Sequence, residues 1–112
     1  RLAEAPEGVD HAFSLRREPF SLCPTDPASL AFLAGLYDQL LPCFESRSFN
    51  VGLDEAFDIG LGRSRAACES RGKGRVYVDF LRQVAGLARD RGRRIQFWAD
   101  GILQHPELHS EI

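Results

Sequence analysis

Short β-rich stretches alternate with amphipathic helical stretches along this chain, and that alternation limits the folds it can adopt. The expected elements, in chain order, are a strand at 11–17, a helix at 27–41, a strand at 48–53, a helix at 76–90 and a strand at 94–100. Strands that alternate with helices of this length are typical of βαβ units, whose strands run parallel. The sequence therefore predicts an α/β fold of parallel βαβαβ order, in one domain over residues 1–112.

The two helices have recognisable starts and stops. Asp26 can cap the free amides of the first helix, and Pro27 suits the first helical position, where no donor is needed. Apolar residues then recur at steps of three and four, which indicates an amphipathic helix. The second helix is predicted from one apolar stripe, with Gly92 as its stop. Between the helices, four glycines within residues 56–74 favour a long loop after the middle strand.

Two carboxylates follow the middle strand directly. The stretch SFNVGL, residues 48–53, is short, β-rich and apolar on both faces, as in a buried parallel strand, and Asp54 and Glu55 come next. Trp98 and Asp100 stand at the end of the following strand. Parallel sheets place their chemistry at the carboxyl ends of the strands. We therefore expect these side chains to meet at one rim.

The chemistry of the Asp54–Glu55 pair has three interpretations. An acidic dipeptide can simply open a surface loop. In the mouth of a sheet or barrel, a protonated acid beside an ionised one is what cleavage of a glycosidic bond needs. With Asp58 close by in the sequence and Asp100 at the end of the next strand, the pair could instead bind a divalent metal ion through hard oxygen ligands. Trp98 could be a core residue, or its indole could stack on the apolar face of a sugar.

Charge, hydropathy and cysteine spacing limit the kinds of partner and metal site that this chain is expected to have. Between Leu61 and Arg94, ten Arg or Lys residues stand against three acids, but Gly, Ser and Ala separate them rather than stacking aromatics, so we expect no nucleic-acid partner. No apolar run approaches the roughly 18 residues that a membrane span needs, and no signal-peptide pattern is seen, so no membrane partner is expected. Cys23, Cys43 and Cys68 lack CxxC spacing, which predicts neither a disulfide framework nor a zinc site.

Three stretches together resemble the family 20 glycoside hydrolases, the β-N-acetylhexosaminidases. FNVGLDEAF is similar to the strand that ends in the catalytic Asp-Glu pair, CPTDPASLAFLAGLYDQLLPCF to the segment and helix before it, and IQFWAD to a later strand whose Trp faces the substrate. The resemblance runs from about Phe13 to Leu103. It implies a (β/α)8 barrel that removes terminal N-acetylhexosamine without a metal or organic cofactor. It is nearest to the often intracellular branch, which implies a cytoplasmic location.

The resemblance also implies roles for single residues. Glu55 would be the general acid that protonates the glycosidic oxygen and later activates water. Asp54 would hold the 2-acetamido group, whose carbonyl oxygen attacks the anomeric carbon. Trp98 would line the sugar pocket, and Asp100 and Asn50 match positions that face the substrate. The expected partner is therefore a glycoside that contains N-acetylhexosamine.

The sequence departs from the family pattern in two residues and in length. Asn50 stands where the family commonly has His, and Leu53 replaces a Gly beside the pair. A (β/α)8 barrel takes about 250 residues, so the chain would supply only about strands three to five with their helices. Such a piece exposes strand edges, through which we expect a homo-oligomer to be able to form. The departures also leave an alternative, a non-catalytic carbohydrate-binding or interaction domain derived from such a barrel.

Overall fold

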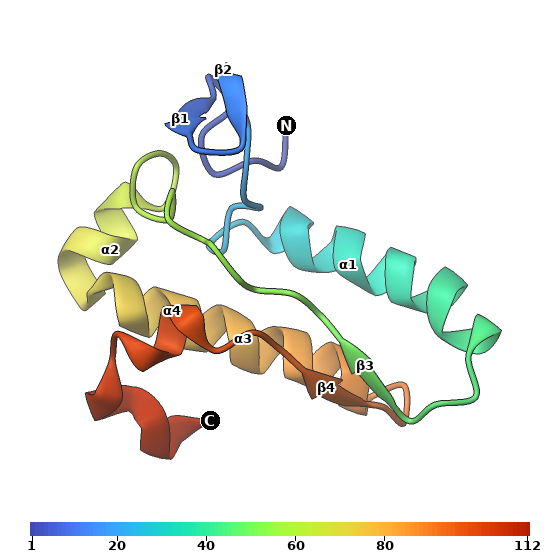
Figure 1. The fold of residues 1–112 in the computed structure, drawn as a ribbon. Coiled ribbons are helices and arrows are strands. Elements are labelled where there is room, and N and C mark those ends of the chain that lie inside the picture. Colours follow the sequence, from blue (N-terminus) through green and yellow to red (C-terminus); the bar gives the residue numbers. More distant parts are fainter.

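The computed structural model describes residues 1–112 as a mixed α/β fold with an antiparallel hairpin at one end (Figure 1). In chain order the elements are β1 (Val9–His11), β2 (Ser14–Glu18), α1 (Pro27–Leu40), the 3-10 helix η1 (Leu41–Cys43), β3 (Ser48–Asn50), α2 (Arg65–Arg71), α3 (Lys73–Arg89), β4 (Arg94–Gln96), α4 (Asp100–Leu103) and the 3-10 helix η2 (Pro106–Glu111). None of these helices has both the length and the apolar run needed to cross a bilayer.

Strands β3 and β4 form the parallel pair that the sequence predicts. Their register is Ser48 with Arg94, Phe49 with Ile95 and Asn50 with Gln96. Parallel hydrogen bonds continue past the regular strands, from Val51 N to Gln96 O at 2.9 Å and from Trp98 N to Gly52 O at 3.0 Å. The chain between the two strands crosses over through α2 and α3, as a βαβ unit requires. The α/β class and the parallel pairing are therefore confirmed.

Both long helices cover the same face of this sheet. Tyr37 and Leu41, from α1 and the turn after it, meet Phe80 and Val84 of α3 in one buried cluster. The strand residues that pack against this cluster are Phe49, Val51 and Leu53. A second buried cluster joins α3 to the C-terminal elements and consists of Ile59, Val76, Tyr77, Val78, Leu81, Ile102 and Leu108.

The other face of the sheet is open. Asn50, Gln96 and Trp98 are exposed, whereas their neighbours Phe97 and Val51 are partly buried. Our expectation that residues 48–53 are buried on both faces is therefore wrong. The two helices pack on one face only, and no other element of the chain crosses the opposite face.

The strand expected at 11–17 is instead a hairpin. The chain reverses after His11, which pairs with Ser14, so the predicted alternation spans two short antiparallel strands. Gly8 permits the close approach of the strands, because a Cβ at this position would lie 2.8 Å from the backbone of Arg17, and its φ is +80°. The turn contains no Gly or Asn, the usual hairpin signals, and this explains why the sequence pattern does not reveal it.

The glycine-rich segment after β3 is only partly a loop. Helix α2 occupies Arg65–Arg71, and α3 begins at Lys73, three residues before the predicted start. The two helices meet at Gly72, whose φ of +86° allows the sharp change of direction. In contrast, α1 begins at Pro27 as predicted, with Asp26 Oδ1 accepting a hydrogen bond from Ala28 N at 2.9 Å.

Candidate functional site

The ends of the two parallel strands meet at one rim. Glu55 follows β3 and Asp100 follows β4, and the Glu55 amide donates a hydrogen bond to Asp100 Oδ2 at 2.9 Å. Asp54 and Trp98 flank these two residues in the sequence, and all four side chains are exposed. The structure thus brings together the strand ends that the pattern placed at one rim. Asp100 opens α4 rather than ending the strand, so the last predicted strand is shorter than 94–100.

The backbone around the carboxylate pair has an unusual conformation. Leu53 and Glu55 have φ angles of 70° and 51°, in the left-handed region that costs a non-glycine residue on the order of 1 kcal/mol. Gly52, with φ of 76°, begins this turn. Its amide donates to Asn50 Oδ1 at 2.7 Å, and a Cβ on it would lie 3.5 Å from Asp54 Oδ1. The carboxylate of Asp54 therefore lies close to Gly52, where the strand ends.

Tyr77 of α3 supports this turn through a hydrogen bond. Its hydroxyl donates to the carbonyl of Leu53 at 3.0 Å, and its buried ring lies so near α4 that a Cβ on Gly101 would be 2.9 Å from it. Burial, with the added effect of the negative charges of Asp100 and Asp54, raises the pKa of Tyr77 to about 12. Tyr77 falls on the apolar stripe from which the second helix is predicted, so the sequence pattern assigns it to the core and does not reveal this role. The available signal was its hydroxyl, which needs a partner when buried.

Glu55 borders two pockets. One, of about 150 Å³, has a mixed lining that includes Lys73, Tyr77, Asp100 and His105. The other, of about 360 Å³, lies toward the β1–β2 hairpin. Glu55 is therefore one of the residues that these two pockets share.

The residues considered as metal ligands do not lie together in the structure. Asp58 is fully buried, and its Oδ2 accepts a hydrogen bond from Ser21 N at 3.0 Å, while Oδ1 has no partner. No three His, Cys, Asp or Glu side chains of the chain come together in a way that could hold a metal ion. The grouping of Asp54, Glu55 and Asp58 that we considered from the sequence does not form.

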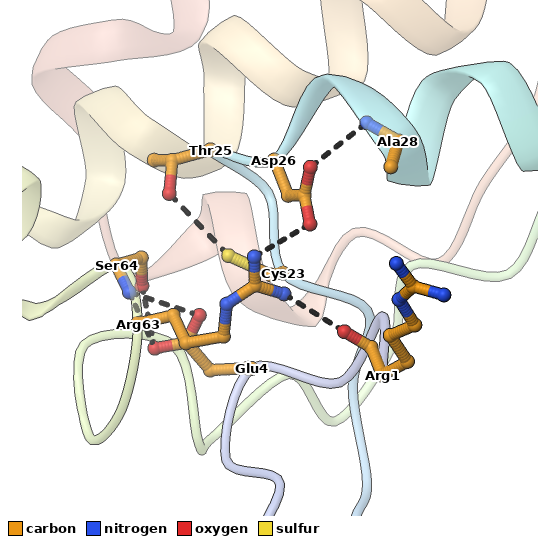
Figure 2. Close-up of polar contacts among 8 residues, drawn as sticks. All are labelled: Arg1, Glu4, Cys23, Thr25, Asp26, Ala28, Arg63 and Ser64. Carbon is orange, nitrogen blue, oxygen red and sulfur yellow. Dashed lines mark hydrogen bonds and ion pairs between the residues drawn. The ribbon is translucent and has the colours of Figure 1, made fainter.

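A second buried acid anchors the loop that follows the carboxylate pair (Figure 2). Glu4 is 0 % exposed, and its carboxylate accepts hydrogen bonds from Ser64 N at 3.0 Å and Ser64 Oγ at 2.8 Å. It also accepts a hydrogen bond from Gly62 N at 3.0 Å. Burial by itself would raise the pKa of Glu4, but the bonds from Ser64 and Gly62 outweigh it and hold that pKa below 4.5. The N-terminal arm is thus tied to the start of α2, an interaction that local sequence patterns cannot reveal.

An ion pair beside Glu4 joins the same loop to the first helix. Arg63 Nη2 lies 2.6 Å from Asp26 Oδ2, and its Nη1 donates to the carbonyl of Arg1 at 3.2 Å (Figure 2). The hydrogen bond from Ala28, followed by that from Arg63, lowers the pKa of Asp26. Asp26 therefore serves both as the cap of α1 and as the partner of Arg63.

No protein-family model matches this chain, and neither does any curated protein.

Proposed function

We propose that this chain is a segment of the (β/α)8 catalytic barrel of a glycoside hydrolase that releases terminal N-acetylhexosamine. The hydrogen bond from Glu55 N to Asp100 Oδ2 carries the proposal, because it joins the carboxyl ends of two neighbouring parallel strands. At that rim, Asp54, Glu55 and Trp98 are open to a ligand. Enzymes built on parallel barrels hold their reacting groups at this end of the strands.

The proposed reaction uses the substrate's own acetamido group. Glu55 gives its proton to the glycosidic oxygen while the bond from that oxygen to the anomeric carbon breaks. The acetamido carbonyl oxygen forms a bond to the same carbon from the other face, and Asp54 holds the acetamido N–H. Water then attacks the anomeric carbon, Glu55 takes a proton from it, and the acetamido group is released unchanged. This chemistry uses no metal ion and no organic cofactor.

The other site residues would orient the sugar. Trp98 is 60 % exposed, so its indole face is free to stack on a pyranose ring. The Oδ1 atom of Asn50 is engaged by the Gly52 amide, which leaves the side-chain NH₂ to donate to a sugar hydroxyl. Asp100 would position the backbone of Glu55 through its Oδ2 atom.

Unpartnered apolar surface supports the assignment to a barrel. Phe32, Leu36 and Leu40 recur at steps of four along α1 and are exposed, although the opposite side of this helix packs on the sheet. In a barrel, neighbouring helices and strands would cover that stripe and the edges of the β3–β4 pair. Where nothing covers these edges, as in the segment by itself, they would instead allow a homo-oligomer. The three cysteines are free, which suits the cytoplasmic location that forms part of this proposal.

The alternative, a carbohydrate-binding or interaction domain without turnover, rests mainly on the two departures from the family pattern. Leu53 gives it little support, because its side chain packs against both buried clusters instead of standing over the rim. Asn50 still differs from the family's His in its acid–base chemistry, and it lies on the open face of the sheet. Binding of N-acetylglucosamine without hydrolysis would favour this alternative.

Hydrolysis of three 4-nitrophenyl glycosides by the complete protein tests the proposal. We expect release of nitrophenol from the N-acetyl-β-glucosaminide or the N-acetyl-β-galactosaminide, and essentially none from the β-glucoside, which lacks the acetamido group. Equal rates on all three would contradict substrate assistance. No release from any of them by well-folded protein would contradict a hydrolase and leave the binding-domain alternative.

A further inference from the structure

A pocket with an aromatic lining lies between Glu55 and the β1–β2 hairpin. Its volume is about 360 Å³, and its lining residues are Asp10, His11, Ala12, Phe13, Glu55 and Phe57. Glu55 is the one lining residue that also belongs to the catalytic pair proposed above. The pocket is therefore continuous with the proposed site of proton transfer.

The aromatic rings around this pocket form one cluster. Phe13 and Phe20 are stacked with their ring centres 6.0 Å apart and their planes at 13°, and Phe57 lies 4.7 Å from Phe20. The imidazole of His11 closes the group at 4.8 Å from Phe20. Phe13 is nonetheless 62 % exposed. Clustered aromatic surface that stays open to solvent marks a binding site more often than a scattered apolar residue does.

Local hydrogen bonds hold the aromatic surface and the acid in fixed relation. The amide of Phe13 donates to His11 Nδ1 at 3.2 Å, which orders the tip of the hairpin. On the other side, the amide of Phe57 donates to the carbonyl of Glu55 at 2.7 Å, and Lys73 Nζ donates to the carbonyl of Phe57 at 2.8 Å. Phe57 and Glu55 thus belong to one tight turn.

We infer that this pocket receives the leaving group of the glycoside, and that it favours a leaving group with an aromatic ring. The inference rests on the proposed function. The glycosidic oxygen must lie within hydrogen-bond reach of Glu55, so the two halves of the substrate extend to either side of this residue. Asp54 and Trp98 take the N-acetylhexosamine, and the leaving group then lies toward the hairpin. The second pocket at Glu55 is smaller and more polar, and Asp100 at its edge already binds the Glu55 amide.

Binding measurements on the complete protein test this assignment without turnover. In a Glu55→Gln background, calorimetry compares 4-methylumbelliferyl with methyl N-acetyl-β-glucosaminide, and free 4-methylumbelliferone is titrated by fluorescence anisotropy. We expect the aryl glycoside to bind about tenfold more tightly than the methyl glycoside, as an aromatic contact of ordinary strength would give. Phe13→Ala should remove this advantage. Leu15→Ala, which truncates a fully exposed side chain on the same hairpin, should keep it.

The outcomes separate this inference from the proposed function. Equal binding of the two glycosides, or an aryl advantage that survives Phe13→Ala, overturns the leaving-group pocket and leaves the hydrolase proposal standing. If neither glycoside binds, the sugar site fails, and the leaving-group role fails with it, whether or not free 4-methylumbelliferone binds. Circular dichroism checks that Phe13→Ala is folded, and Phe13→Trp should restore the aryl advantage.

Discussion

Glu55 and Asp100 are 45 positions apart in the chain, yet the Glu55 amide donates a 2.9 Å hydrogen bond to Asp100 Oδ2. Glu55 has a φ of 51°, a conformation that a non-glycine residue holds only when its surroundings enforce it. The Asp100 carboxylate supplies part of that enforcement. It thereby links the conformation of the proposed acid to the end of the neighbouring strand.

Removing this acceptor should affect the chemical step more than substrate binding. We expect Asp100→Ala to lower kcat by about tenfold with little change in KM, because the carboxyl group of Glu55 loses its fixed position. Asp100→Asn keeps an oxygen that can accept the same hydrogen bond, and should restore most of the rate. Steady-state kinetics of both variants decide the question. An equal loss of kcat in the two variants would contradict a positioning role through the hydrogen bond from the Glu55 amide.

Tyr77 should make stability depend on pH in the alkaline range. Its pKa of about 12 in the folded chain lies above the ordinary value of 10.0, so the folded state holds the phenol proton more tightly than the unfolded state. The resulting stabilisation is complete below pH 10 and is lost as the pH rises through about 12. The free energy of unfolding should therefore fall between these values by on the order of 2 kcal/mol more in the wild type than in Tyr77→Phe.

Urea unfolding at several alkaline pH values measures this difference. Near neutral pH, the free energy of unfolding of Tyr77→Phe should be about 1 kcal/mol lower than that of the wild type, because no hydroxyl donates to the Leu53 carbonyl. Tyr37→Phe is the comparison at the other tyrosine, whose pKa is also raised by burial; it should keep the part of the alkaline fall that belongs to Tyr77 and the hydrogen bond to Leu53. An identical alkaline slope in the wild type and in Tyr77→Phe would show that Tyr77 is not the group responsible.

Glu4 should contribute stability that acid removes. Because its pKa in the folded chain is held below 4.5, its contribution is present above that pH and is lost as the pH falls through the lower folded value. Glu4→Gln places an NH₂ group among the amide and hydroxyl donors of Gly62 and Ser64, and should cost about 1–3 kcal/mol at neutral pH. Its unfolding free energy should also depend less on pH below 4.5.

Chemical denaturation between pH 3 and pH 7 gives both quantities. Glu7→Gln is the matched control, because Glu7 is an exposed acid in the same arm. If Glu4→Gln lowers the free energy of unfolding by no more than Glu7→Gln does, the buried carboxylate has no anchoring role.

The parts of the fold that were predictable are those set by local patterns. Asp26 and Pro27 mark the start of α1 in the sequence, and the apolar stripe that includes Phe80 and Val84 marks α3. The parallel strands were predictable as a pair, but their length was not. The positive φ angles of Gly52 and Leu53 end β3 early, and the sequence pattern of an apolar stretch contains no sign of them.

The parts that sequence reasoning missed depend on distant contacts. Helix α2 begins at a loop that Glu4 holds from 60 residues away through Ser64, so a glycine-rich stretch that looked like a loop becomes partly helical. The convergence of Glu55 with Asp100 could be expected from strand order alone, because parallel strands end at the same edge. For Tyr77, the hydroxyl signals that a buried partner is needed, but only the three-dimensional structure identifies that partner as the Leu53 carbonyl.

The most direct test of the proposed hydrolase is the Glu55→Gln variant of the complete protein, assayed on 4-nitrophenyl N-acetyl-β-glucosaminide. Gln keeps the size of the side chain but cannot supply the proton, so we expect hydrolysis to fall by at least about a hundredfold. Binding of N-acetylglucosamine, followed by calorimetry, should persist. Glu69→Gln, at an exposed acid on α2, should retain the full rate. Wild-type hydrolysis by Glu55→Gln would contradict the assignment of Glu55 as the acid.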